Sequence, residues 1–238
     1  MKIKSMKLIV NEKQYNWILN EMKKECLSEM AYPTSFNFDE FRQCRSFAER
    51  VRYCETRLER IAQGSSRIVY RVDDDKVLKL AKNNKGVAQN SVEIRLGTEP
   101  YYTCFADVYE YDENGLWVEM EICRKAKKSD FKAIYGVPFE ALCCMMVRQA
   151  ESQGPRRNSF GYREYADYEP IVQQVWDGEE NELQMLFMSL QEYIGGEMLS
   201  GVGDLCRISS WGVDSEGYFK LVDYGLTDEV YNNFYRRR

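Results

Sequence analysis

The chain has 238 residues, of which 44% are hydrophobic and 30% charged, with a formal net charge of −5 and a pI near 5.2. This is the composition of an ordinary globular protein, and its acidic balance offers no overall attraction for nucleic acid. No apolar run approaches the roughly 20 residues of a membrane span, and residues 1–10 lack the features of a signal peptide. We therefore expect a cytoplasmic protein with neither nucleic acid nor a membrane as partner.

Histidine is absent and the eight cysteines form no C-x-x-C pair. The first observation excludes Ser-His and Cys-His nucleophiles, histidine-ligated zinc and imidazole base catalysis. The second favours reduced thiols in a reducing compartment. Any catalysis must depend on carboxylates, lysine or a bound metal.

Residues 1–57 are expected to form a mainly helical extension. A short strand is predicted over Lys7–Val10 and a helix over Asn11–Leu27, where apolar residues recur at helical spacing. Turn-forming residues follow Pro33, and the helical pattern resumes over Phe38–Arg57.

Residues 58–122 change to the alternation of strands. Ile61–Val72 predicts two strands around a glycine turn, and Lys76–Ala81 predicts a third. A helix is expected over Gly86–Leu96. Phe105–Tyr111 and Leu116–Ile122 then predict a hairpin, which gives five strands and one helix.

Residues 123–238 are predicted to be mostly helical, and we expect them to form a third region of the chain. The clearest helices span Val137–Ala150 and Asn181–Tyr193, and a polar loop covers Glu151–Tyr168. A short apolar strand is expected over Tyr218–Val222.

Lys79 stands between two leucines in an apolar strand, so alternation places its side chain on the face opposite both of them. A lysine there needs solvent or a partner. Binding phosphate and simply facing solvent are both open interpretations. Polar residues of the following helix are the candidate partners: Glu93 first, with Gln89 and Asn90 as rivals.

Gly64, Ser65 and Ser66 form a turn of small residues ahead of this strand. Backbone N–H groups of such a loop can approach phosphates, although a single glycine is also common in a structural turn. From Gly64 through Ala81 the sequence resembles the glycine-rich loop and V-A-I-K strand of protein kinases. The resemblance implies a loop that covers the phosphates of ATP and a lysine, Lys79, that neutralises them.

Downstream, the segment from Gly217 to Leu226 resembles the kinase strand that leads into D-F-G, with Tyr224 in place of phenylalanine. The resemblance implies that Asp223 holds Mg²⁺ against the nucleotide.

The segment from Val202 to Trp211 resembles an eroded H-R-D-L-x-x-x-x-N loop. It implies that Asp204 orients an acceptor hydroxyl, with Ser209 or Ser210 where a metal-binding asparagine would stand. A helix-capping or turn carboxylate is the competing interpretation of Asp204.

Leu116–Glu121 is similar to the kinase strand and hinge that meet an adenine ring, which implies adenine contacts from backbone groups near Glu119 and Glu121. Over residues 58–230 the chain also resembles small kinase-like proteins encoded by bacterial viruses. The expected fold is therefore α+β and kinase-like, with a five-stranded antiparallel small lobe and a reduced helical lobe.

The chain ends fifteen residues after Asp223, without the activation segment and helices that dock a protein substrate in protein kinases. Three functions stay open. The first is an ATP-Mg²⁺ phosphotransferase acting on an unknown protein or small-molecule acceptor. The others are a pseudokinase-like module that binds a protein, and a structural component of a virus particle.

Overall fold

A computed structural model describes residues 32–99, 103–152, 164–197 and 202–236. The strand expected over Lys7–Val10 and the helix expected over Asn11–Leu27 lie outside the described residues. Within them no helix combines the length and apolar character needed to cross a membrane.

The described part of the N-terminal extension forms two helices, α2 (Phe38–Gln43) and α3 (Phe47–Glu55). The sequence predicted one helical pattern here. The break arises because Ser46 starts a new helix through a capping box, in which its hydroxyl accepts from the Glu49 N–H and the Glu49 carboxylate accepts from the Ser46 N–H. Asn37 caps α2 in a similar way.

Five antiparallel strands follow, in the spatial order β1-β2-β3-β5-β4. All five strands predicted over residues 58–122 are present within a few residues of their expected bounds. They are β1 (Glu59–Gln63), β2 (Arg67–Arg71), β3 (Lys76–Ala81), β4 (Val108–Tyr111) and β5 (Trp117–Glu121).

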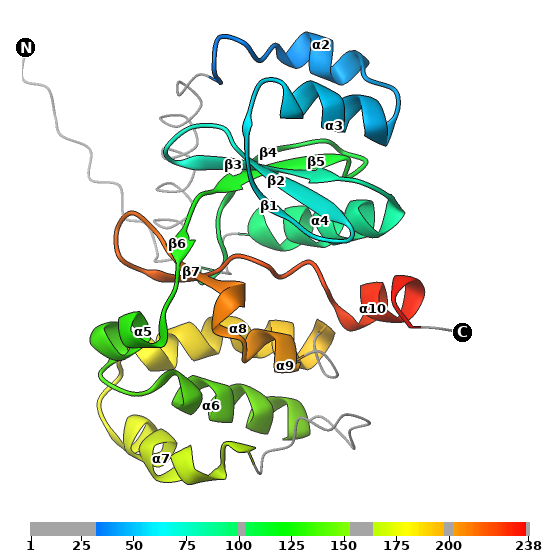
Figure 1. Ribbon diagram of the computed structural model, residues 1–238. Helices are drawn as coiled ribbons and strands as arrows, with labels where there is room; N and C mark the ends of the chain where they lie inside the picture. The colour runs from blue at the N-terminus through cyan, green and yellow to red at the C-terminus, as the bar shows by residue number, and fades with distance from the viewer. Residues whose placement is uncertain (1–31, 100–102, 153–163, 198–201, 237–238) are drawn as a thin grey trace, which may run out of the picture.

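Both faces of this sheet are covered (Figure 1). Helix α4 (Asn84–Gly97) packs on one face, and α2 and α3 lie over the other. Leu78 and Leu80 of β3 are fully buried beneath α2 and α3 in an aromatic cluster that includes Phe41 and Trp117. Lys79 alternates to the α4 face, as the sequence predicted.

The remaining chain is mainly helical and is built around α6, whose buried face contacts several neighbouring helices. The long helices α6 and α8 were expected from the sequence, whereas α7 was not. The helices are α5 (Lys128–Tyr135), α6 (Phe139–Ser152), α7 (Glu169–Asp177), α8 (Glu182–Glu197), α9 (Val202–Leu205) and α10 (Asp228–Phe234). A second sheet of three strands contains β6 (Arg124–Lys125), β7 (Trp211–Val213) and β8 (Phe219–Leu221).

The segment that enters β4 joins the two parts of the molecule. The Leu221 N–H donates to the Cys104 carbonyl at 2.7 Å, and the Ala106 N–H donates to the Leu221 carbonyl at 3.0 Å. These bonds hold the end of β8, and therefore Asp223, beneath the five-stranded sheet. The fold is α+β, with a five-stranded antiparallel sheet followed by a mainly helical part, as predicted from the sequence.

Candidate functional site

Lys79 lies in the middle of β3, directly opposite Val69 of β2 and Val118 of β5. Its side chain is only 9% exposed, so its ammonium group needs partners. Nζ is 2.9 Å from Glu93 Oε2 and donates to the Val222 carbonyl at 2.6 Å. The lysine thus connects helix α4 to the residue that precedes Asp223.

Glu93 is the residue of α4 that faces Lys79, and its side chain is completely buried. The two rival partners have other roles. Gln89 accepts a hydrogen bond from the Ser66 hydroxyl at 2.5 Å, and Asn90 donates to the Gly115 carbonyl at 2.9 Å. The structure therefore places the Lys79 ammonium against the carboxylate rather than against either amide.

The loop of Gly64, Ser65 and Ser66 is tied to the start of α4. The Lys82 N–H donates to the Ser66 carbonyl at 2.8 Å, and the Asn83 amide donates to the Ser65 carbonyl at 3.1 Å. A Cβ atom at Gly86 would lie 2.3 Å from the Ser66 carbonyl oxygen, so the helix needs glycine where the loop passes it. At Gly64 a Cβ would meet open space, and sterics do not require glycine there.

Asp223 follows β8 and lies beside the Lys79–Glu93 pair. Its Oδ1 is 2.8 Å from an amino group of Arg67, whose other amino group is 2.7 Å from Glu93 Oε2. The Asp223 side chain is 60% exposed, and the positive charges of Arg67 and Lys79 beside it lower the pKa of its carboxyl. The contact between Arg67 and Asp223 was not predicted from the sequence, because it joins positions 156 residues apart.

The two residues after Asp223 are fixed against α4 and β4. Tyr224 is buried, stacks on Phe105 with ring centroids 4.5 Å apart, and donates its hydroxyl to the Ala106 carbonyl at 3.0 Å. A Cβ at Gly225 would lie 2.5 Å from the Gln89 carbonyl oxygen. The glycine of the Asp-Tyr-Gly segment is therefore required by a close backbone approach.

Asp204 and Asp223 open onto the same cavity, which has a volume of about 200 Å³. Asp204 lies in α9, its side chain is 39% exposed, and its Oδ1 is 3.0 Å from Arg207. Ser209 is exposed at the rim, and the Ser210 hydroxyl donates to the Asp204 carbonyl at 2.8 Å. The cavity is lined by Tyr193, Asp204, Leu205, Arg207, Ser209, Ser210, Asp223, Tyr224 and Leu226.

Glu119 and Glu121 lie away from Lys79. Glu119 stands opposite Leu78 on the other face of the sheet, where it pairs with Lys76 at 3.2 Å. The Glu121 N–H already donates to the Asp107 carbonyl at 2.9 Å. That N–H is therefore engaged within the sheet, and adenine contacts from backbone groups near Glu119 and Glu121 stay a prediction.

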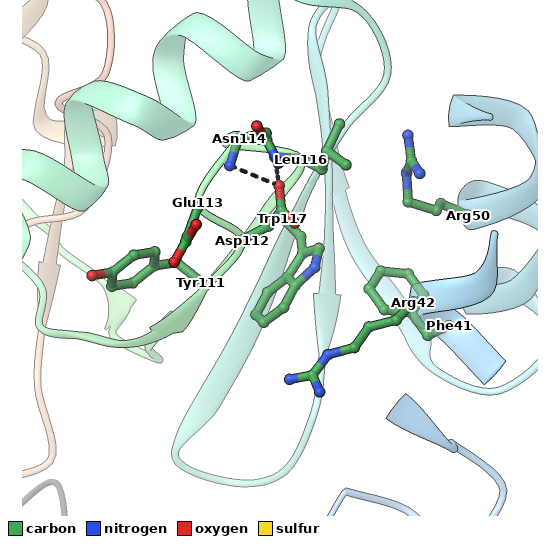
Figure 2. A pocket seen from close by; sticks show the side chains of 9 residues that line it. All are labelled: Phe41, Arg42, Arg50, Tyr111, Asp112, Glu113, Asn114, Leu116 and Trp117. Carbon is green, nitrogen blue, oxygen red and sulfur yellow. Dashed lines mark hydrogen bonds between the residues drawn. The ribbon is translucent and has the colours of Figure 1, made fainter. Parts of the chain in front are cut away.

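A second cavity, of about 280 Å³, lies between the N-terminal extension and the turn joining β4 to β5 (Figure 2). Phe41, Arg42 and Arg50 contribute from the extension, and Trp117 from β5. The Asp112 carboxylate holds the turn by accepting from backbone N–H groups. None of the residues predicted for the nucleotide site lines this cavity.

The residues around Asp223 do not fit Mg²⁺ as they are arranged. One carboxylate oxygen bonds to Arg67, and a neutral hydroxyl, Ser209, stands where a second oxygen ligand was expected. Across the described residues, no group of three or more potential metal-binding side chains comes together.

No family model and no curated protein matches the chain. Two solved structures are similar to it at low identity. One is the GDP and kanamycin complex of APH(2")-IIia, with 16% identity over 71% of this chain and 67% of that chain and a TM-score of 0.33. The other is the streptomycin-ATP-APH(2")-IIa ternary complex, with 9% identity over 92% and 72% and a TM-score of 0.33.

Proposed function

We propose that this chain is a kinase-like protein that binds a nucleoside triphosphate, such as ATP, with its phosphates between Lys79 and Asp223. One observation carries the proposal. A buried lysine, held by Glu93 and the Val222 carbonyl, lies beside the end of β8, on the strand that pairs with β2, which follows the loop of Gly64, Ser65 and Ser66. A lysine fixed in this way supplies positive charge to phosphates without a large loss of side-chain entropy.

Phosphate transfer is the second candidate function, favoured by the shared cavity of Asp204 and Asp223. The Asp204 carboxylate would accept a hydrogen bond from an acceptor hydroxyl and orient its oxygen towards the nucleotide. The acceptor, a protein or a small molecule, is not identified by these residues. A cytoplasmic location and the similarity to proteins of bacterial viruses remain predictions from the sequence.

Thermal unfolding with and without ATP tests nucleotide binding. ATP at about 100 times its dissociation constant adds about 2.7 kcal/mol of stability, a rise of roughly 5–11 °C in Tm for a domain of this size. The rise should disappear in Lys79→Ala and persist in Lys132→Ala, whose lysine is exposed on α5. If no nucleotide shifts the transition, the proposed function is wrong.

Transfer is tested separately with γ-labelled ATP. Incorporation of label into the protein or into added extract, lost in Asp204→Asn while the thermal shift is retained, would support phosphotransfer. A normal thermal shift with no incorporation would instead describe a nucleotide-binding protein without transferase activity.

A further inference from the structure

Arg67 lies on the same face of the five-stranded sheet as Lys79. It pairs with Ala81 across β2 and β3, two positions before Val69 pairs with Lys79, so Arg67 and Lys79 project from the same face. The Arg67 side chain is only 10% exposed. A buried guanidinium in this place needs compensating acceptors, because it stays charged.

Those acceptors come from both parts of the molecule. One amino group of Arg67 is 2.7 Å from Glu93 Oε2 and 3.4 Å from Asn90 Oδ1, and the other is 2.8 Å from Asp223 Oδ1. Burial works against the charged form, but the carboxylates of Glu93 and Asp223 outweigh it and raise the pKa of Arg67. Arg67 thus bridges helix α4 and the Asp-Tyr-Gly segment.

The charges at this point already balance without a metal ion. Two cations, Lys79 and Arg67, face two carboxylates, Glu93 and Asp223. A divalent cation on Asp223 would lie within a few ångströms of a guanidinium that cannot lose its proton, which opposes its binding. A guanidinium, in turn, presents a planar fork of N–H donors that suits phosphate oxygens.

We propose that Arg67 takes the charge-neutralising place of a divalent cation against Asp223, so that this chain binds nucleoside triphosphates without requiring a metal ion. The inference rests on the proposed function, because it concerns the same site. In this arrangement Arg67 is a phosphate-binding residue, and Asp223 holds its guanidinium in position.

Titration calorimetry of ATP in EDTA and in excess MgCl₂ tests the inference. The wild-type protein should give dissociation constants that agree within about threefold in the two buffers. Arg67→Met should weaken binding in EDTA by about tenfold or more, because one of the two cations is gone. Excess Mg²⁺ should restore part of that loss, since Asp223 is then free to bind the ion.

Two further variants keep the test informative. Arg71→Met, on the same strand but with a side chain 44% exposed, should leave both dissociation constants unchanged. Arg67→Lys retains the charge and should bind in EDTA more tightly than Arg67→Met, even if the methionine variant is poorly folded. Unfolding of each variant without ligand shows whether its fold is intact.

The outcomes separate the inference from the proposed function. Wild-type binding that requires Mg²⁺ would overturn the role of Arg67 and leave nucleotide binding in place. Equal affinity of wild type, Arg67→Lys and Arg67→Met in EDTA would also overturn it. No binding in either buffer would refute the proposed function itself.

Discussion

Strand β3 carries a buried lysine–glutamate pair on each of its two faces, and the two pairs differ in their surroundings. Lys76 and Glu119 are closed in on the side of the N-terminal extension, 3.2 Å apart and 5% and 3% exposed. Lys79 and Glu93 are also buried, but Glu93 contacts Arg67 as well, and Lys79 donates to the carbonyl of Val222, the residue before Asp223. A buried ion pair alone is therefore no sign of function; its connection to an open cavity is the informative feature.

The largest expected loss of stability comes from breaking the Lys76–Glu119 pair. Lys76→Met would leave the Glu119 carboxylate buried without its cation, which should cost about 3–5 kcal/mol of unfolding free energy. Urea denaturation measures this loss, with Lys132→Met as an exposed control. The shift in Tm caused by ATP should stay normal in any Lys76→Met protein that folds. A cost below about 1 kcal/mol would show that the pair is solvated.

The second effect concerns Glu121, which stands opposite Lys76 across the strand pair. Burial raises the pKa of Glu121 to about 7 from 4.5, although Lys220 partly opposes the shift. The folded state then holds the proton more tightly than the unfolded state. Wild-type stability should fall as the pH rises from 4.5 to 7, by up to about 3 kcal/mol.

Glu121→Gln should remove this pH-dependent loss, because the amide does not titrate. Unfolding free energies of both proteins at a series of pH values provide the measurement. Parallel pH profiles for the two proteins would contradict a raised pKa at Glu121.

Breaking the Lys79–Glu93 pair should cost less unfolding free energy than breaking the Lys76–Glu119 pair. In Lys79→Met the Glu93 carboxylate keeps Arg67 at 2.7 Å, so the expected loss is only about 2 kcal/mol. ATP binding should nevertheless be lost. Denaturation and ATP titration of Lys76→Met and Lys79→Met together separate the two roles, and equal effects of both variants on stability and on binding would remove the distinction.

The smallest effect is expected in the loop of Gly64, Ser65 and Ser66. Ser66→Ala removes the hydrogen bond from the hydroxyl to Gln89, at a cost of about 1 kcal/mol. Ser65→Ala is the matched control, because Ser65 is exposed and its substitution should change stability little. Thermal unfolding of the two variants makes the comparison; a larger loss in Ser65→Ala would mean that the loop is held differently.

Much of the fold could be predicted because local patterns agree with the final packing. The strand expected over Lys76–Ala81 has its predicted bounds, and alternation alone placed Lys79 opposite the leucines. Helix α7 was missed although Val172 and the partly buried Ile171 and Val175 give it an apolar face. It follows the polar loop, and its periodic signal covers only nine residues.

The site was predictable in part. Lys79, Asp204 and Asp223 have recognisable local sequences, and the structure brings Asp204 and Asp223 to one cavity. Arg67 could have been placed on the Lys79 face by counting two residues back from Val69, but its bond to Asp223 joins positions 156 residues apart. Neither that contact nor the hydrogen bond that occupies the Glu121 N–H is encoded in a local pattern.

Labelling with an acyl-phosphate derivative of ATP, which acylates lysines beside a bound nucleotide, tests the central claim most directly. Mass spectrometry of digested protein should identify acylated Lys79, and excess ATP should prevent its labelling while leaving that of Lys132 unchanged. If Lys79 is not acylated, or if excess ATP fails to protect it, the nucleotide does not bind between Lys79 and Asp223.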